Sequence, residues 1–159
     1  MTKLHNPSRI APPIGTYSHG AEVPPNARWL YVAGQIGLAK DGSVPATIEG
    51  QTEVAWQNVA AVLAAASMRV ADIVKVNQYL TRLDHFPGYA AARARHLGDH
   101  RPASTLVVVS ALVKPEYLVE VEVVAARAAP AAAARVRERA APPAKRTAAR
   151  KPAKRARRR

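Results

Sequence analysis

Residues 101–126, RPASTLVVVSALVKPEYLVEVEVVAA, contain two segments that favour β-strands, and their patterns decide the fold class. Ser104 to Leu112 is an almost continuous apolar run, which predicts a strand buried on both faces. Leu118 to Ala126 alternates instead, so that Glu120 and Glu122 share one face and valines occupy the other. The two segments therefore predict a sheet at the end of the folded domain.

Two earlier segments also favour strands, and the chain between them favours a helix. Arg28 to Gln35 and Ile73 to Leu80 are rich in β-branched and aromatic residues. From Ile48 to Ser67, apolar residues recur at the spacing of an amphipathic helix, in the stripe Trp56, Val59, Ala60 and Leu63. Thr47 is a candidate N-cap for this helix, because its hydroxyl can accept a hydrogen bond from a free backbone N–H.

A second helix is expected over residues 84–98. Asp84 is its candidate N-cap, Pro87 is tolerated in the first turn, and Gly98 marks the end. A short extra strand is possible near Tyr17. The predicted order is β-α-β-α-β-β, which makes the folded part a mixed α/β domain.

The positive charge of the chain is concentrated at its C-terminal end. The net charge is +13, but residues 128–159 hold twelve Lys and Arg against one Glu, so residues 1–127 carry only +2. Residues 128–159 are mostly Ala, Pro, Lys and Arg and cannot bury enough apolar surface to fold. The composition therefore predicts a folded domain over residues 1–127 and a disordered basic tail over 128–159. Such a polycation either binds phosphate backbones without sequence preference or serves as a solubilising extension, and both interpretations stay open.

Composition also excludes several classes of protein. The chain has no cysteine, so it has neither a disulfide framework nor a thiolate nucleophile. Its N-terminus has no apolar run of signal-peptide length, and no segment approaches the roughly 20 apolar residues that span a bilayer. We expect a cytoplasmic protein with no membrane partner.

Residue types and spacing alone suggest little chemistry. Glu120 and Glu122 lie about 7 Å apart on one strand face. Inverting glycosidases use a similar separation, but their carboxylates flank a cleft rather than lie side by side on one strand. His96 and His100 are four residues apart, but Gly98 between them is expected to end the helix, so no metal site is predicted.

Several motifs together resemble those of a known family. IGTYSHG at Ile14–Gly20 and VAGQIGL at Val32–Leu38 are followed by RPAST, a run of β-formers and VEVEV at Val119–Val123. This order over residues 6–127 resembles the RidA/YjgF family. The resemblance implies a chorismate-mutase-like fold, with a mixed six-stranded sheet backed by two helices, that assembles as a homotrimer. It also implies a small-molecule site in each cleft between subunits, where active members hydrolyse enamine and imine intermediates without a cofactor.

The resemblance reveals one important departure at the proposed site. In deaminating members the strand opens with Pro-Ala-Arg-Ser, and the planar arginine binds the substrate carboxylate. Here Ser104 stands in that place, and one neutral hydroxyl cannot replace a bidentate cation. Arg101 is a nearby candidate for substrate binding, but it precedes Pro102 and would approach from another direction. Ala90, where many members carry asparagine, is a second departure.

Three other positions match the family. Glu120 matches the carboxylate that activates the attacking water, a role suited to a general base. Tyr17 matches the tyrosine that lines the cleft, and Gly34 lies where the backbone approaches the ligand. Each has a purely structural alternative, as an exposed strand residue, a packing aromatic and a strand bend respectively.

Two classes of function follow. The first is a cofactor-independent hydrolase of imine, enamine or related C–N compounds, with its 2-imino acid deaminase activity altered or lost because of Ser104. The second is a non-catalytic ligand-binding or nucleic-acid-associated protein that acts through its basic tail. The retained Glu120 and Tyr17 favour the first class, and Ser104 and the tail favour the second.

Overall fold

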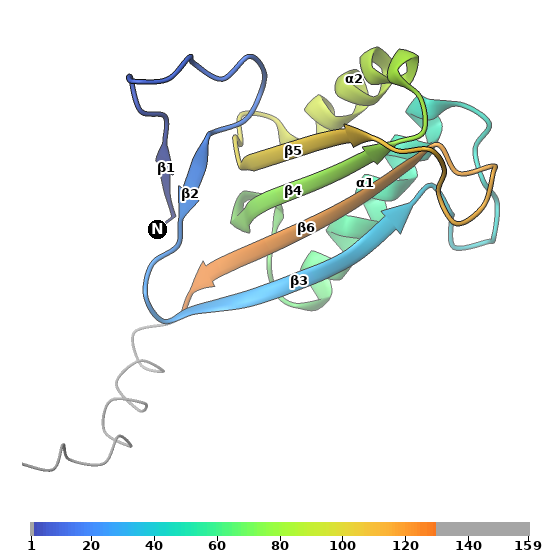
Figure 1. Cartoon of the computed structure of the whole chain (residues 1–159). Coiled ribbons are helices and arrows are strands. Elements are labelled where there is room, and N and C mark those ends of the chain that lie inside the picture. Colours follow the sequence, from blue (N-terminus) through green and yellow to red (C-terminus); the bar gives the residue numbers. More distant parts are fainter. Residues whose placement is uncertain (1, 130–159) are drawn as a thin grey trace, which may run out of the picture. The chain divides into compact units, whose positions relative to one another are not determined.

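The computed structural model describes residues 2–129 (Figure 1). Its helices are α1 (Ile48–Ala65) and α2 (Phe86–Leu97), and its strands are β1 (Lys3–His5), β2 (Gly20–Glu22), β3 (Ala27–Ile36), β4 (Ile73–Leu80), β5 (Ala103–Val108) and β6 (Val119–Ala128). Short 3₁₀ turns at Val70–Asp72 and Leu83–His85 lead into β4 and α2. Residues 130–159, which make up nearly all of the predicted tail, lie outside the described residues.

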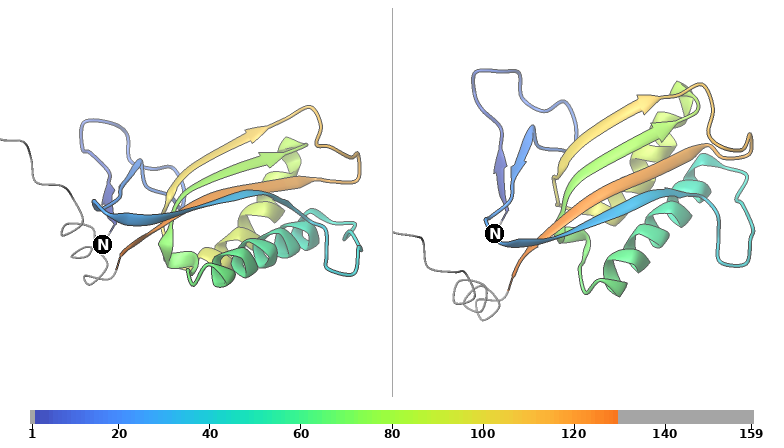
Figure 2. Two further views of the ribbon diagram at one scale, coloured as in Figure 1. Left: turned by 90° about the horizontal axis from the view of Figure 1, so that it is seen from below. Right: turned by 60° about the horizontal axis from the view of Figure 1, so that its bottom comes forward.

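Four strands form one mixed sheet in the order β3-β6-β4-β5. β6 pairs antiparallel with both β3 and β4, whereas β4 and β5 are parallel neighbours. Parallel neighbours need a crossover connection, which α2 supplies here. Both helices cover the same face of the sheet (Figure 2), so the opposite face, which we call the open face, is left without a helix in the described chain.

The remaining two strands form a hairpin of their own. β1 and β2 pair antiparallel with each other, and an isolated bridge between Ser18 and Ala103 links this region to β5. Pro24 and Pro25 follow β2 and cannot donate ladder hydrogen bonds, which separates the hairpin from β3. The six expected strands are present, divided between a four-stranded and a two-stranded sheet.

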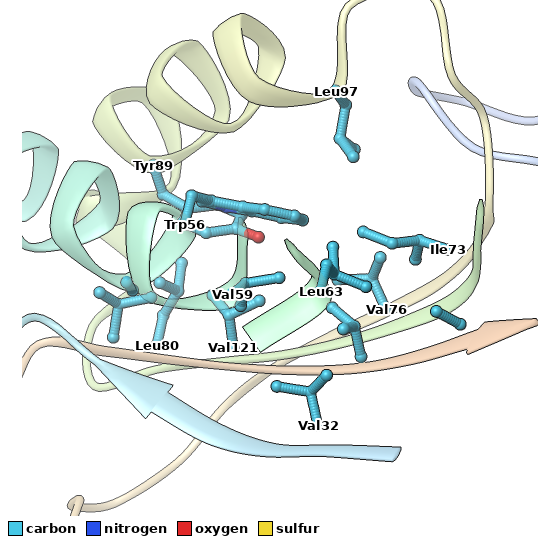
Figure 3. Packing of buried hydrophobic residues seen from close by; sticks show 14 of the residues in the cluster. Val32, Trp56, Val59, Leu63, Ile73, Val76, Leu80, Tyr89, Leu97 and Val121 are labelled. Carbon is cyan, nitrogen blue, oxygen red and sulfur yellow. The ribbon is translucent and has the colours of Figure 1, made fainter. Parts of the chain in front are cut away.

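The core lies between the helices and the covered face of the sheet (Figure 3). Trp56, Val59 and Leu63 of α1 are fully buried, as the predicted stripe requires. They meet a layer of sheet side chains made of Val32, Val76, Leu80, Val119, Val121, Val123 and Ala125. Complete burial of a Val or Leu side chain stabilises a fold by about 1.5–3 kcal/mol, so this contact fixes which face of β6 turns inward.

The helix ends confirm most of the local predictions. Thr47 caps α1 by accepting a hydrogen bond from the Gly50 N–H at 3.2 Å. Pro87 lies in the first turn of α2, and Gly98 ends that helix with a φ of +53°. The expected cap at Asp84 is wrong, because its carboxylate pairs with Arg82 at 2.5 Å instead.

The expectation that Ser104 to Leu112 is buried on both faces is also wrong in the described chain. β5 ends at Val108 and is an edge strand of the sheet. Val107 and Val108 keep 42% and 46% of their surface exposed. The apolar run predicted the strand correctly, but nothing in the described chain covers its outer face.

Among residues 2–129, no helix combines the length and the apolar character that crossing a membrane requires.

Candidate functional site

Glu120 lies on the open face of the sheet, directly over Gly34. Its neighbours along β6, Val119 and Val121, are fully buried on the covered face, so the alternation of the strand turns Glu120 outward. β3 has a register irregularity between Val32 and Gln35, which includes Gly34. A Cβ at Gly34 would lie 1.7 Å from Glu120 Oε1, so a larger residue here would displace the carboxylate from its present position.

The neighbouring carboxylate, Glu122, is held in a different way. Asn77 Nδ2 and the Tyr79 hydroxyl each donate to Glu122 at 3.4 Å. Burial raises the pKa of Tyr79, and the charges of Glu122 and Glu120 raise it further. By contrast, no side chain of the described residues donates a hydrogen bond to Glu120. Glu120 therefore keeps its full acceptor capacity for water or a ligand, whereas Glu122 uses part of its own.

Ser104 faces the helices, on the opposite side of the sheet from Glu120. It pairs in register with the fully buried Val76 of β4. Its hydroxyl accepts a hydrogen bond from Gln78 Nε2 at 2.8 Å, and Gln78 Oε1 accepts one from the Tyr89 hydroxyl at 2.5 Å. Gln78 and Tyr89 are almost completely buried, so this chain of hydrogen bonds fixes the Ser104 side of β5 against α2.

Tyr17 lies in the segment that borders the start of β5. Ser18, the next residue, donates its N–H to the Pro102 carbonyl at 3.1 Å and is itself buried. The Tyr17 ring is partly exposed and packs edge-on against His19, with ring centroids 5.7 Å apart. We call residues Thr16–Ser18 and Pro102–Ser104 the β5 entrance.

Arg101 comes before the β5 entrance and is occupied by its own loop. Its Nη1 donates to the carbonyls of Gly98 at 2.6 Å and His100 at 3.2 Å. Its Nη2 lies 3.8 Å from an Asp99 carboxylate oxygen. The side chain therefore stabilises the turn between α2 and β5 in this structure.

Arg93 of α2 also reaches the β5 entrance, and sequence analysis did not single it out. Only 7% of its surface is exposed. Its Nη1 donates to the Thr16 carbonyl at 3.2 Å and to the Thr16 hydroxyl at 2.7 Å. The available signal was the four-residue spacing from Tyr89 to Arg93, which places both side chains on one face of a helix.

The two groups of residues do not meet within one chain. Glu120 pairs with Tyr79, whereas Ser104 pairs with Val76, three residues earlier on the same strand. Strand geometry separates them by about 10 Å along the strands and about 10 Å across them, on opposite faces. One chain brings Glu120 to Gly34, and it brings the segment of Tyr17 to the start of β5, but it does not join these two places.

The histidines singled out by spacing are also separate. His96 Nε2 lies 3.0 Å from Glu53 Oε1, and its ring stacks on Trp56 with centroids 6.0 Å apart. His100 Nε2 instead lies 2.7 Å from the Ile73 carbonyl oxygen. Within residues 2–129, no group of three or more His, Cys, Asp or Glu side chains could hold a metal ion.

A shallow surface pocket lies elsewhere, at the beginning of α2. It is lined by Arg82, Leu83, Asp84, Phe86 and Pro87. None of the site residues predicted from sequence lines it.

Comparison with known proteins identifies the family. The family model described as Endoribonuclease L-PSP matches residues 8–127. A RutC family protein of Pyrococcus horikoshii is 35% identical over 115 residues, which are 71% of this chain and 88% of that protein. The 2-iminobutanoate/2-iminopropanoate deaminase of Escherichia coli is 31% identical over 118 residues, which are 72% of this chain and 89% of that enzyme.

Comparison with solved structures points to the same family. A Rid family protein of Yersinia pestis superposes with a TM-score of 0.71 at 26% identity, covering 79% of this chain and 98% of that one. Escherichia coli TdcF with bound serine gives a TM-score of 0.61 at 28% identity, and the match covers 79% of this chain and 99% of that one. Sequence and fold thus agree that this chain belongs to the Endoribonuclease L-PSP family, which is the RidA/YjgF family that the motifs resemble.

Proposed function

We propose that this protein is a cofactor-independent hydrolase of small imines and enamines, whose sites are completed between subunits of a homotrimer in the cytoplasm. The observation that carries the proposal is the Glu120 carboxylate, which lies over Gly34 with acceptor capacity to spare. A relative of similar sequence is named as a 2-iminobutanoate/2-iminopropanoate deaminase, and a structural neighbour holds serine. Both support a small-molecule ligand.

The reaction needs one base and one water molecule. The substrate reacts as the protonated imine, so that Glu120 takes a proton from water as the oxygen adds to the C=N carbon and a neutral carbinolamine forms. Glu120 then returns this proton to the nitrogen, the C–N bond breaks and ammonia leaves, while the hydroxyl oxygen becomes the carbonyl oxygen and releases its proton to solvent. No redox partner is required.

Assembly explains why the site is divided in one chain. Trp29 and Tyr31 extend from the open face of β3, 49% and 75% exposed, and stack with centroids 6.5 Å apart. Exposed apolar patches of this kind mark interfaces. When the open faces pack together, Glu120 of one subunit can meet the β5 entrance of its neighbour.

The test compares Glu120→Gln with Glu122→Gln. Hydrolysis of a panel of imines, with and without a carboxylate, is followed by ammonia release against the spontaneous rate. Glu120→Gln should lower kcat at least 100-fold, because an amide cannot act as a base and general-base catalysis contributes roughly 10²–10⁴-fold. Glu122→Gln should retain most activity, since Asn77 and Tyr79 hold that side chain.

Two results would contradict the proposal. One is a wild-type rate equal to the spontaneous rate for every imine, and the other is a Glu120→Gln variant as active as wild type. In the first case the alternative gains support, namely a non-catalytic ligand-binding or nucleic-acid-associated protein acting through residues 128–159.

A further inference from the structure

The Arg93 guanidinium is a buried cation that no carboxylate of the described chain neutralises. Within residues 2–129, no acidic side chain lies within ion-pair distance of it. Its Nε and Nη2 are buried and have no hydrogen-bond partner in the described chain. Buried charges are expected to be paired, because an unpaired one loses its hydration without compensation.

The unpartnered atoms are the informative part of this side chain. Both hydrogen bonds to Thr16 are donated by Nη1. Nε and Nη2 lie along one edge of the planar guanidinium, where their N–H bonds run parallel and match the two oxygens of a carboxylate. Thr16 therefore anchors the group at Nη1, and its bidentate edge, which has the Tyr89 hydroxyl as a neighbour, makes no hydrogen bond of good geometry in the described chain.

The surroundings are electropositive and polar. Burial lowers the pKa of Arg93, Tyr89 raises it, and the nearby charge of Arg101 lowers it again. A guanidinium stays protonated at physiological pH even so. Arg93 and Arg101 thus place two cations beside the β5 entrance, and Tyr89, next to Arg93, begins the Tyr89–Gln78–Ser104 hydrogen bonds.

The segment that holds the guanidinium lies at the surface. Gly15 and Thr16 are exposed, and Thr16 is the residue that accepts from Nη1. Because Nε and Nη2 are themselves buried, anion binding at this edge requires the chain around it to move.

We propose that Arg93 binds the carboxylate of this protein's ligand through its Nε–Nη2 edge, in place of the strand arginine that Ser104 lacks. The inference rests on the proposed small-molecule site and names its anion-binding residue. The cation enters from α2 instead of β5, so the bound carboxylate is displaced from the position that a β5 arginine would give it. The ligands of this site are small carboxylates. Their carboxylate is bound in a different place from that of a 2-imino acid on a β5 arginine.

In the direct test, the full-length protein is titrated with 2-oxobutanoate. The uncharged compound 2-oxobutanamide serves as the control. The ¹H–¹⁵N signal of Arg93 Nε, assigned by its absence in Arg93→Lys, should shift with the carboxylate and not with the amide. The dissociation constant measured by calorimetry should be at least tenfold lower for the carboxylate.

The matched variants are Arg93→Lys and Arg95→Lys, on the same helix. Lysine keeps the charge but cannot present a bidentate edge, so Arg93→Lys should bind 2-oxobutanoate at least tenfold more weakly. Arg95 is exposed and pairs with Glu53, so Arg95→Lys should bind within twofold of wild type. Circular dichroism spectra matching wild type would confirm that both variants fold.

The outcomes separate this inference from the proposed function. Carboxylate binding that depends on Arg93, without imine hydrolysis, supports the anion site and refutes the hydrolase. Imine hydrolysis with the same kcat/KM for acidic substrates in Arg93→Lys refutes the anion site and leaves the hydrolase standing. No Nε shift, or equal affinity of wild type and Arg93→Lys, overturns the inference.

Discussion

At the residue scale, the direction of a single side chain changes the interpretation of the site. Ser104 occupies the place of the family's arginine, yet its hydroxyl belongs to a buried network with Gln78 and Tyr89. The Glu120 side chain lies on the opposite face of the same sheet. One ligand cannot contact both residues within a single chain, which is why we propose a site between subunits.

The first prediction concerns Ser104→Arg. Wild type should hydrolyse 2-iminobutanoate slowly, and the arginine should raise kcat/KM at least tenfold by adding a charge-assisted contact to the substrate carboxylate. Ammonia release measures the gain. Val113→Arg is the control, because this loop position is 85% exposed and should gain nothing. Fast hydrolysis of 2-iminobutanoate by wild type would contradict this prediction, because it would show that Ser104 does not limit the reaction.

At the element scale, local signals predicted helices well, and signals that depend on distant contacts did not. Thr47, Pro87 and Gly98 act within one helical turn, so their roles could be predicted from sequence. Asp84 has a side chain that can cap a helix, but its carboxylate forms an ion pair with Arg82 instead.

The α1 cap gives a prediction at this scale. Thr47→Ala should lower the free energy of unfolding by about 1 kcal/mol, because the Gly50 N–H loses its acceptor. Chemical denaturation measures the change. Thr47→Asp should restore most of the stability, since aspartate is also a good N-cap, and a destabilised Thr47→Asp would mean that the threonine methyl group matters more than the cap.

The limits of sequence-based prediction have specific physical causes here. The apolar run after Ser104 indicates a strand but cannot say whether its outer face is covered by this chain or by another. The partner of Ser104 depends on the register between β4 and β5, which no local pattern contains. Arg93 stands among alanines and another arginine, so it resembles a solvated helix residue until α2 is packed against β4. Glu120 and Gly34 were singled out because each matches a position of the family, and their contact with each other emerges only in the structure.

At the scale of the whole molecule, the proposals concern assembly and the basic tail. The open face presents aromatic residues and two carboxylates, and the covered face holds the core. We expect a trimer with a mass of about three times 17.0 kDa.

Tyr31→Asp tests the assembly. Tyr31 is 75% exposed in the single chain, so a charge there is harmless to a monomer but costly inside an interface. Light scattering should show Tyr31→Asp dissociating at micromolar concentration. Val113→Asp, at a loop position that is 85% exposed, should leave the trimer intact. A monomeric wild type would disprove the assembly.

The tail gives the last prediction. Removal of residues 130–159 should abolish binding to DNA and RNA while leaving the trimer unchanged. The cut follows Ala129 because Ala128 still pairs with Ala27 at the end of β6. The full chain should bind with little sequence preference, and its affinity should fall steeply as salt rises, which fluorescence anisotropy measures. Equal binding by the shortened chain would assign the nucleic-acid contact to the folded domain.

The outer side of β5 has a consequence for how this protein is handled. β5 pairs with β4 on one side, and in the described chain its other side carries only the bridge at Ala103, beyond which its backbone groups and Val107 and Val108 are uncovered. Uncovered edges of this kind template association with other chains. A subunit freed by dilution or by an interface mutation should therefore aggregate sooner than it unfolds. The shelf life of the protein should depend on its concentration, with dilute stocks losing material first.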